Sequence, residues 1–315
     1  MNTILFRSGP VKIAIRSVNA DEIIRGLDTS FARRYIPDFT LETLSVEPSD
    51  PDAVINWKSS SAGFKVEETV LDGSPEEYTV KTPAPAPYVN EAPYFFILQV
   101  LSRLYAKKNM VVFTDTVSFV GRDGEAIVLM GYPHSGKSTI TAIALHKGYI
   151  PLTTENTVID FSGAEPLITG GTSILVYDPV IRELYGVSTP VHDRTRHGYV
   201  IVDLDKVVPE RRQKLDRGVR ISRLYVLHCS FSSIGADQKP IRGRKIRKTL
   251  WYFAIALVKG VDYYDPYPLD LGTVDAMKPI GKAIMRMSDE YGCRFFEVYG
   301  KHDEVFKMIT GEEKN

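Results

Sequence analysis

The chain has 315 residues, of which 43% are hydrophobic and 25% charged, a balance typical of a globular protein too long for one small core. This length favours about two domains. Basic and acidic residues number 39 each, so no overall positive field attracts nucleic acid or an anionic membrane. We therefore expect neither as a partner.

The first part of the chain, residues 1–90, is predicted to be a small α+β domain. Alternating apolar residues predict an opening strand at 11–17, and helical spacing predicts one helix over 19–35. Further short strands are expected, separated by Pro, Asp, Gly and Ser, and they should form an antiparallel sheet. These runs are FTLETLSVE (39–47), AVINW (53–57), GFKVEETV (63–70) and EEYTVKT (76–82).

The proline-rich segment TPAPAPYVNEAP (82–93) favours an extended connector and marks the domain boundary. The next segment, YFFILQVLSRLYAKKN (94–109), is apolar on nearly every side and ends in lysines, so it predicts a buried helix with a cationic carboxyl end. Residues 91–315 are then expected to form an α/β domain with a mixed sheet and carboxyl-terminal helices.

Within this second domain, two strand-like runs around GRDG (121–124) predict a hairpin, and a helix over 137–148 follows. Residues 149–161 are expected to be a further strand. Later strands are predicted at 173–179, 198–205 and 223–231, and later helices at 244–260 and 274–292.

The two cysteines, Cys229 and Cys293, fall in a predicted strand and at a helix-to-strand junction. A disulfide framework or a zinc site needs more ligands at closer spacing. The amino terminus has no apolar core with a cleavage signature, and no apolar run approaches the length of a membrane span. These features favour free thiols in a cytoplasmic protein.

The segment GYPHSGKST (131–139) fits the phosphate-loop pattern G-x-x-x-x-G-K-[ST]. Its glycines let backbone N–H groups approach phosphates, Lys137 compensates β- and γ-phosphate charge, and the Ser138 hydroxyl can ligate Mg²⁺. A nucleoside triphosphate, or another polyphosphate, is the expected ligand. The residues predicted to contact it are Gly131, His134, Ser135, Gly136, Lys137, Ser138 and Thr139.

Two acidic residues are candidates for holding the metal or preparing the attacking group. Glu155 follows the predicted helix, at the end of a strand that should return towards the loop. Asp203 ends the apolar run YVIVD (199–203), a pattern by which most P-loop nucleotidases hold Mg²⁺. Each of the two is equally compatible with a surface acid at the end of a strand.

The order of these features resembles a known family. Residues 95–113, the hairpin, AIVLMGYPHSGKST (126–139) and YIPLTTENTVI (149–159) are similar to the catalytic domain of HPr kinase/phosphorylase and the HPr-kinase-related kinases. The resemblance is most specific over 93–160. It implies a P-loop kinase domain with a fold like that of phosphoenolpyruvate carboxykinase, preceded by a small leading domain, and it implies ATP and Mg²⁺ as cofactors.

The chain departs from the family pattern in four respects. The loop has Pro133-His134-Ser135 where the family has a glycine, and the family's aspartate pair falls on Glu155 and Asn156. The family's histidine falls within Thr114–Thr116, where Asp115 could substitute as an acid although the neighbouring threonines suggest a strand surface. The glycine-rich segment for HPr recognition is not found, so HPr is not the predicted substrate.

These observations predict an ATP- and Mg²⁺-dependent kinase that phosphorylates a hydroxyl of a protein serine or a small metabolite. Lys137 and Glu155 are the predicted catalytic residues, and Ser138, Glu155 and Asn156 the predicted metal ligands. Two alternatives stay open: a nucleotide-binding regulatory protein without chemistry, and an ordinary P-loop NTPase that uses Asp203. Pyrophosphate as donor and a homo-oligomeric state are also open.

Two cationic stretches allow a functional or a plain solvated interpretation. Arg194, Arg196 and His197 lie on an expected loop, where a guanidinium could neutralise the transferring phosphate. The cluster RGRKIRKTLW (242–251) has five cations and could dock nucleic acid or an acidic protein, or form a solvated helix face.

Overall fold

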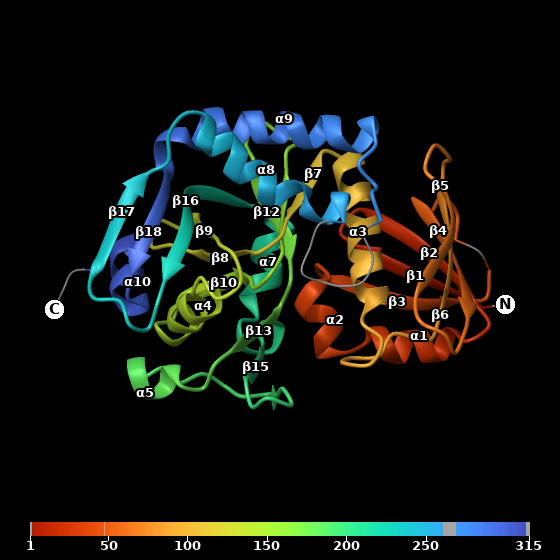
Figure 1. Ribbon diagram of the computed structural model, residues 1–315, viewed down its shortest axis with the longest axis horizontal. Coiled ribbons are helices and arrows are strands. Elements are labelled where there is room, and N and C mark those ends of the chain that lie inside the picture. Colours follow the sequence, from red (N-terminus) through yellow and green to blue (C-terminus); the bar gives the residue numbers. More distant parts are fainter. Residues whose placement is uncertain (1, 47, 261–268, 313–315) are drawn as a thin grey trace.

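The computed structural model describes residues 2–46, 48–260 and 269–312, and it has α/β architecture with mixed sheets. The predicted α/β class is therefore confirmed at this level. Figure 1 shows a sheet of amino-terminal strands at one end of the molecule and a larger sheet at the other, with a helix between them. No helix in the described ranges is long and apolar enough to cross a membrane.

The amino-terminal sheet has six strands in the order β3-β1-β2-β4-β6-β5. Its strands are β1 (Asn2–Ser8), β2 (Val11–Ser17), β3 (Phe39–Leu44), β4 (Ala53–Ser59), β5 (Lys65–Val70) and β6 (Glu76–Thr82). A hairpin of β1 and β2 opens the chain, where a single strand was expected. The predicted antiparallel sheet is wrong in part, because β4 runs parallel to both of its neighbours. Long connections before β4 and β6 return the chain to the same end of the sheet.

The predicted single helix over 19–35 is two helices, α1 (Ala20–Leu27) and α2 (Ser30–Tyr35). Thr29 separates them with an extended backbone, and its Oγ1 accepts a hydrogen bond from the Ala32 N–H at 3.2 Å. This cap starts a new helix in a new direction. The apolar spacing predicted the helical residues but not the break between them.

The helix between the two sheets is α3 (Ala92–Lys107), and every residue in it except Lys107 is buried. It packs against β2 and α2 on the amino-terminal side and against later elements of the chain on the other. One hydrophobic cluster runs from Ile4 through α3 to Phe295. The expected buried helix is confirmed, and the core continues across residue 90.

The second sheet has nine strands, with the order β10-β8-β9-β16-β12-β11-β7 and with β18 pairing with β16 and β17. They are β7 (Met110–Phe113), β8 (Thr116–Val120), β9 (Ala126–Met130), β10 (Ile150–Thr153), β11 (Thr157–Asp160), β12 (Leu167–Gly171), β16 (Val219–Cys229), β17 (Ala236–Pro240) and β18 (Phe295–Gly300). Strand β16 runs parallel to β9 and to β18, and the remaining pairs are antiparallel.

Two predicted strands are each divided in the structure. The run 111–120, which is the first of the two strand-like runs around GRDG, turns at Thr114 and Asp115, and the run 149–161 turns at 154–156. The first run divides into β7 and β8, and the second divides into β10 and β11. Strand β7 pairs with β11, whereas β8 pairs with β9 and β10. Both turns lie at the edge of the sheet where β9 ends, which places them beside the loop 131–139.

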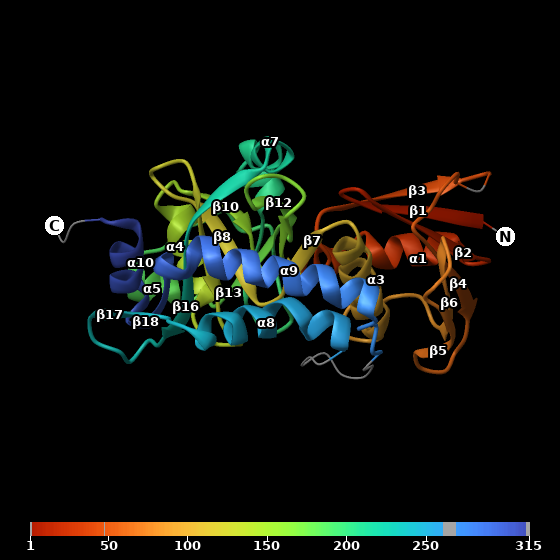
Figure 2. The ribbon, with the colours of Figure 1, turned by 90° about the horizontal axis from the view of Figure 1, so that it is seen from above.

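The remaining described elements are helices and a third sheet, which has three strands in the order β13-β15-β14. They are α4 (Lys137–His146), β13 (Ile174–Tyr177), α5 (Ile181–Tyr185), β14 (Asp193–Arg194), β15 (Val200–Asp203), α6 (Leu204–Val207), α7 (Glu210–Arg217), α8 (Arg244–Lys259), α9 (Val274–Tyr291), a 3-10 turn (Gly292–Arg294) and α10 (His302–Thr310). Helices α8 and α9 lie side by side along one face and extend over α3, as Figure 2 shows from above.

A fully buried arginine, Arg211 of α7, joins the amino-terminal part to the second sheet. Its Nε donates to the Leu152 carbonyl at 2.7 Å, and its Nη2 lies 3.1 Å from an Asp38 carboxylate oxygen. A second carboxylate, that of Asp205, lies 2.6 Å from Nη1. A buried guanidinium is tolerated when its donors are matched in this way.

A second buried arginine, Arg103 of α3, makes a similar connection. Its Nε donates to the Glu76 carboxylate at 3.0 Å, and its Nη2 lies 3.0 Å from Asp275 of α9. Lys107 adds a further ion pair to Glu76 at 2.7 Å. The start of β6, α3 and α9 are thus tied by one charged network.

Replacing Arg211 tests the first of these connections. We expect Arg211→Ala to lower the free energy of unfolding by about 3–5 kcal/mol, because it removes the buried guanidinium and leaves the largely buried Asp38 carboxylate with only the half-exposed Arg212 as its partner. Arg212 contacts the same two carboxylates but is 42% exposed, so Arg212→Ala should cost only about 0–1 kcal/mol. Denaturant unfolding measures both, and equal losses would contradict the assignment.

Candidate functional site

A cavity of about 790 Å³ opens at the sheet edge where β9 and β16 end. Residues of the loop 131–139 form one side of it, and residues of α2 and of the turn after β10 form another. Of the residues predicted to contact a nucleotide, all but Gly131 line this cavity: His134, Ser135, Gly136, Lys137, Ser138 and Thr139.

The loop connects the end of β9 at Met130 to the start of α4 at Lys137. Gly136 has a φ of +100°, and a Cβ at this position would lie 2.7 Å from the His302 ring and 2.8 Å from Cys229. A Cβ at Gly131 would lie 2.3 Å from the Ser135 Oγ. Both pattern glycines are therefore required by close approach, as well as by backbone conformation at Gly136.

Lys137 is buried and its ammonium group has three partners, of which Asp115 lines the cavity. Nζ donates to the carbonyls of Gly131 and Tyr132 and lies 3.2 Å from a carboxylate oxygen of Asp115. These two hydrogen bonds direct the Lys137 side chain towards the first residues of its own loop. Its charge is thus compensated by Asp115, and an incoming phosphate would compete with that carboxylate.

Asp115 does not lie on a strand surface, as its threonine neighbours suggested. It is 4% exposed in the turn between β7 and β8, with a φ of +51°. Its carbonyl accepts a hydrogen bond from the Gly131 N–H at 3.2 Å, in addition to the ion pair with Lys137. The turn that interrupts the predicted strand therefore places the Asp115 carboxylate beside Lys137 of the loop 131–139.

Glu155 lines the same cavity, as its position after the helix predicted. Its N–H donates to Thr172 Oγ1 at 2.9 Å, and its carbonyl accepts from the Thr116 N–H at 2.9 Å. Burial raises the pKa of the Glu155 carboxyl above its usual value, and Arg34 and Lys137 oppose that shift. The structure thus brings Glu155, Asp115 and Lys137 to one cavity.

Asn156 does not reach the cavity, and its predicted role as a metal ligand has no support from this placement. The side chain is fully buried, and its Nδ2 donates to the Tyr35 carbonyl at 2.6 Å. The amide therefore fastens the turn after β10 to the end of α2. That contact joins residues more than a hundred positions apart, so a local sequence pattern does not predict it.

Asp203 is also placed away from the loop. Its carboxylate accepts from the Asp205 N–H at 3.2 Å as the cap of α6, and it lies 3.4 Å from Lys206. It is absent from the described residues that line the cavity. Neither Arg194 nor Arg196 lines the cavity, whereas His197 does.

The donors in the cavity fit Mg²⁺ bound together with phosphate. Mg²⁺ takes oxygen ligands and is usually held by one or two carboxylates, waters and substrate phosphates. Ser138, Asp115 and Glu155 offer a hydroxyl and two carboxylates in the same cavity. Over the described ranges, no group of three or more His, Cys, Asp or Glu side chains could hold a metal. A phosphate would complete the metal's coordination.

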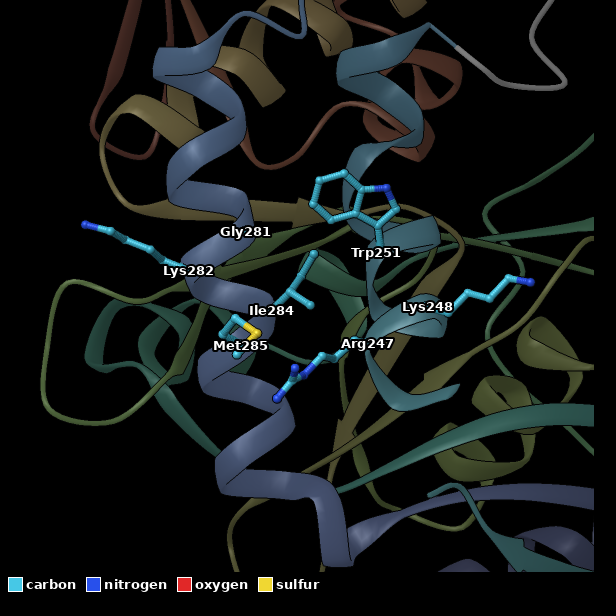
Figure 3. Close-up of a pocket in the computed structure, with 7 residues that line it drawn as sticks. All are labelled: Arg247, Lys248, Trp251, Gly281, Lys282, Ile284 and Met285. Atoms are coloured by element: carbon cyan, nitrogen blue, oxygen red, sulfur yellow. The ribbon is translucent and has the colours of Figure 1, made fainter. Parts of the chain in front are cut away.

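The cationic cluster 242–251 lies on another part of the molecule. Most of its residues form the first part of α8. Some of them border a groove of about 690 Å³ that lies between α8 and α9. Figure 3 shows this groove, with Trp251 and Met285 beside the cationic side chains. The residues lining it are Arg247, Lys248, Trp251, Gly281, Lys282, Ile284 and Met285. It shares no lining residue with the cavity at the loop.

Comparisons with known proteins do not identify the chain. No protein-family model matches it, and no curated protein matches it. The loop, the cavity and the groups that face it are therefore the features of this chain that bear on its function.

His302 gives a prediction about stability. Burial lowers its pKa to about 4, whereas the unfolded chain should titrate near 6.5. The unfolded state then binds the extra proton, so stability present above pH 6.5 is lost as pH falls towards 4. In His302→Gln the acid-side loss should be smaller by roughly 3 kcal/mol.

Denaturant unfolding of both proteins across this pH range measures the difference. The same experiment on His146→Gln provides a control, because His146 lies at the exposed end of α4. Parallel pH profiles for the wild type and His302→Gln would show that this histidine is not buried in its neutral form.

Proposed function

We propose that the chain is an ATP- and Mg²⁺-dependent kinase that phosphorylates a hydroxyl group on a protein serine or a small metabolite. The observation that carries this proposal is that Lys137 of the loop shares one cavity with the carboxylates Asp115 and Glu155. Phosphoryl transfer needs a cradle for polyphosphate, acidic metal ligands and a group that prepares the acceptor. In this proposal the loop, the two carboxylates and Glu155 would fill these three roles.

The loop and α4 provide the phosphate site in this proposal. Backbone N–H groups at the start of α4 attract anions, because their partial positive charges add along the helix. Gly136 permits the close approach, and Lys137 neutralises charge on the β- and γ-phosphates. Mg²⁺ held by Ser138, a carboxylate and the nucleotide phosphates would further neutralise the transferring group when bound.

Glu155 is assigned the role of general base. A general base works best when its pKa lies near the working pH. Burial raises the pKa of the Glu155 carboxyl and so brings it closer to that pH. The acceptor hydroxyl gives its proton to Glu155 while its oxygen bonds to the γ-phosphorus. The bond between that phosphorus and the bridging oxygen breaks, and ADP leaves.

Asp115 supplies the second carboxylate that the resemblance to HPr-kinase-related kinases implies and that Asn156 lacks. It comes from the turn before β8, the same region where the family carries a histidine. We infer from this a P-loop kinase fold like that of phosphoenolpyruvate carboxykinase, with Asp115 and Glu155 as the acidic pair. The mixed sheet, with a loop and a helix after β9, is compatible with such a fold.

The first test removes the lysine of the loop. Lys137→Ala should weaken ATP binding by roughly 10- to 100-fold and abolish transfer, because it removes a charge-assisted contact to phosphate. A mass-spectrometric screen of proteins and hydroxyl metabolites incubated with ATP measures transfer. Unaltered phosphorylation by Lys137→Ala would refute the proposal, and ATP binding with no product from the wild type would favour a regulatory protein.

The second test separates the two acidic candidates. Glu155→Gln should slow transfer to the acceptor found in that screen by about 10²- to 10⁴-fold, since the amide cannot take a proton. Asp203→Asn should leave the rate unchanged, because Asp203 caps α6. The opposite outcome would support an ordinary P-loop NTPase that uses Asp203.

The pH dependence of wild-type transfer gives a third measurement. Glu155 acts as a base only when ionised, so the rate should fall as pH drops through its raised pKa. This acid limb should lie above the range of an ordinary glutamate and should disappear from the residual activity of Glu155→Gln. An identical acid limb in both proteins would assign it to another group.

A further inference from the structure

The order of strands places different chemistry on the two sides of the loop 131–139. Strands β10 and β8 lie on one side of β9, and they bring Glu155 and Asp115 to the sheet edge. Strands β16 and β18 lie on the other side, both parallel to β9. In open α/β sheets ligands bind outside the carboxyl ends of parallel strands, and β9, β16 and β18 form a parallel set within this mixed sheet.

The side beyond β16 carries an aromatic cluster. Phe231 follows β16 and His302 follows β18, and both line the cavity. Their ring centroids are 4.7 Å apart, and the Tyr185 ring is stacked on Phe231 at 6.3 Å with an interplanar angle of 21°. The cluster touches the loop, since Gly136 has no room for a Cβ beside the His302 ring.

Two groups at this end of the cavity carry no charge, although Lys301 lies 5.4 Å from the centroid of the Tyr185 ring. The lowered pKa of His302 keeps its ring neutral at physiological pH, and Tyr185 hydrogen-bonds its Nδ1 at 3.0 Å. Burial raises the pKa of the neighbouring Cys229 thiol to about 12, so it too is neutral. Neither His302 nor Cys229 therefore offers a charge to a second phosphate or a carboxylate.

Phe231 is 45% exposed, although two rings support it. A phenyl group held in place and left open towards a cavity is suited to stack on a flat ligand. The Phe231 ring therefore offers a ready surface beside the phosphate loop.

We propose that Phe231, backed by His302 and Tyr185, is the platform on which the purine base of the nucleotide stacks. The proposal rests on the proposed kinase function and adds to it the nature of the phosphoryl donor, a nucleoside triphosphate in place of pyrophosphate. The base is at the β16 and β18 side of the loop, and the γ-phosphate is at the side of Lys137 and Glu155. The acceptor then enters from the side of α2.

Binding of two polyphosphates tests this assignment. Isothermal titration calorimetry with Mg²⁺ should show that the wild type binds ATP more tightly than inorganic tripolyphosphate, which has no base. Phe231→Ala should weaken ATP binding by roughly 5- to 100-fold, the range that one base stacked on an aromatic side chain contributes. Its affinity for tripolyphosphate should stay the same.

Two further variants control for fold and ring chemistry. Phe231→Tyr keeps a ring and should keep ATP affinity, whereas Phe231→Leu keeps apolar volume and should lose it. Trp251 is a similarly exposed aromatic residue in the α8 and α9 groove, so Trp251→Ala should leave both affinities unchanged. Thermal melts confirm that each variant is folded.

The outcomes separate this inference from the proposed function. Equal affinity of the wild type for ATP and tripolyphosphate would overturn the base platform and leave the polyphosphate site intact. An equal loss of both ligands in Phe231→Ala would also overturn it, because it would show damage to the loop. Failure of the wild type to bind either ligand would overturn the platform and the proposed function together.

Discussion

The buried guanidinium of Arg211 is the contact on which the geometry of the site depends. Its N–H groups donate to the Asp38 carboxylate before β3, to the Leu152 carbonyl in β10 and to the Gly171 carbonyl at the end of β12. The same region holds Thr172, whose hydroxyl accepts the N–H groups of Glu155 and Asn156. One charged side chain thereby sets where the turn carrying Glu155 lies relative to the amino-terminal part.

The cavity is consequently built by both parts of the chain. Arg34 and Tyr35 of α2 face it from the amino-terminal part, and the Tyr35 carbonyl receives the Asn156 amide. Arg34 also lowers the cost of ionising Glu155, because its positive charge opposes the effect of burial on that pKa. The amino-terminal part thus contributes directly to the electrostatics of the site, which a leading domain attached by a simple linker would not do.

The features predicted correctly from the sequence are those fixed by short stretches of chain. The strand, loop and helix around Gly136, the burial of α3 and the approach of Glu155 to the loop all follow from local spacing. Features set by distant partners were missed or wrong. Asp115 reaches Lys137 because its strand breaks, Asn156 turns to Tyr35, and β4 runs parallel to β2 through long connections. The pairing of β18 with β16 places His302 beside Phe231, and the sequence likewise did not predict this pairing.

Helix α3 has a consequence for how the molecule folds and responds to ligands. It is buried almost from end to end, and the hydrophobic cluster that contains it is shared by the amino-terminal sheet and the nine-stranded sheet. We therefore expect the two sheets to open together, because local unfolding around α3 would expose the cluster that they share. Occupancy of the cavity would then protect backbone amides as far away as the amino-terminal strands from hydrogen exchange.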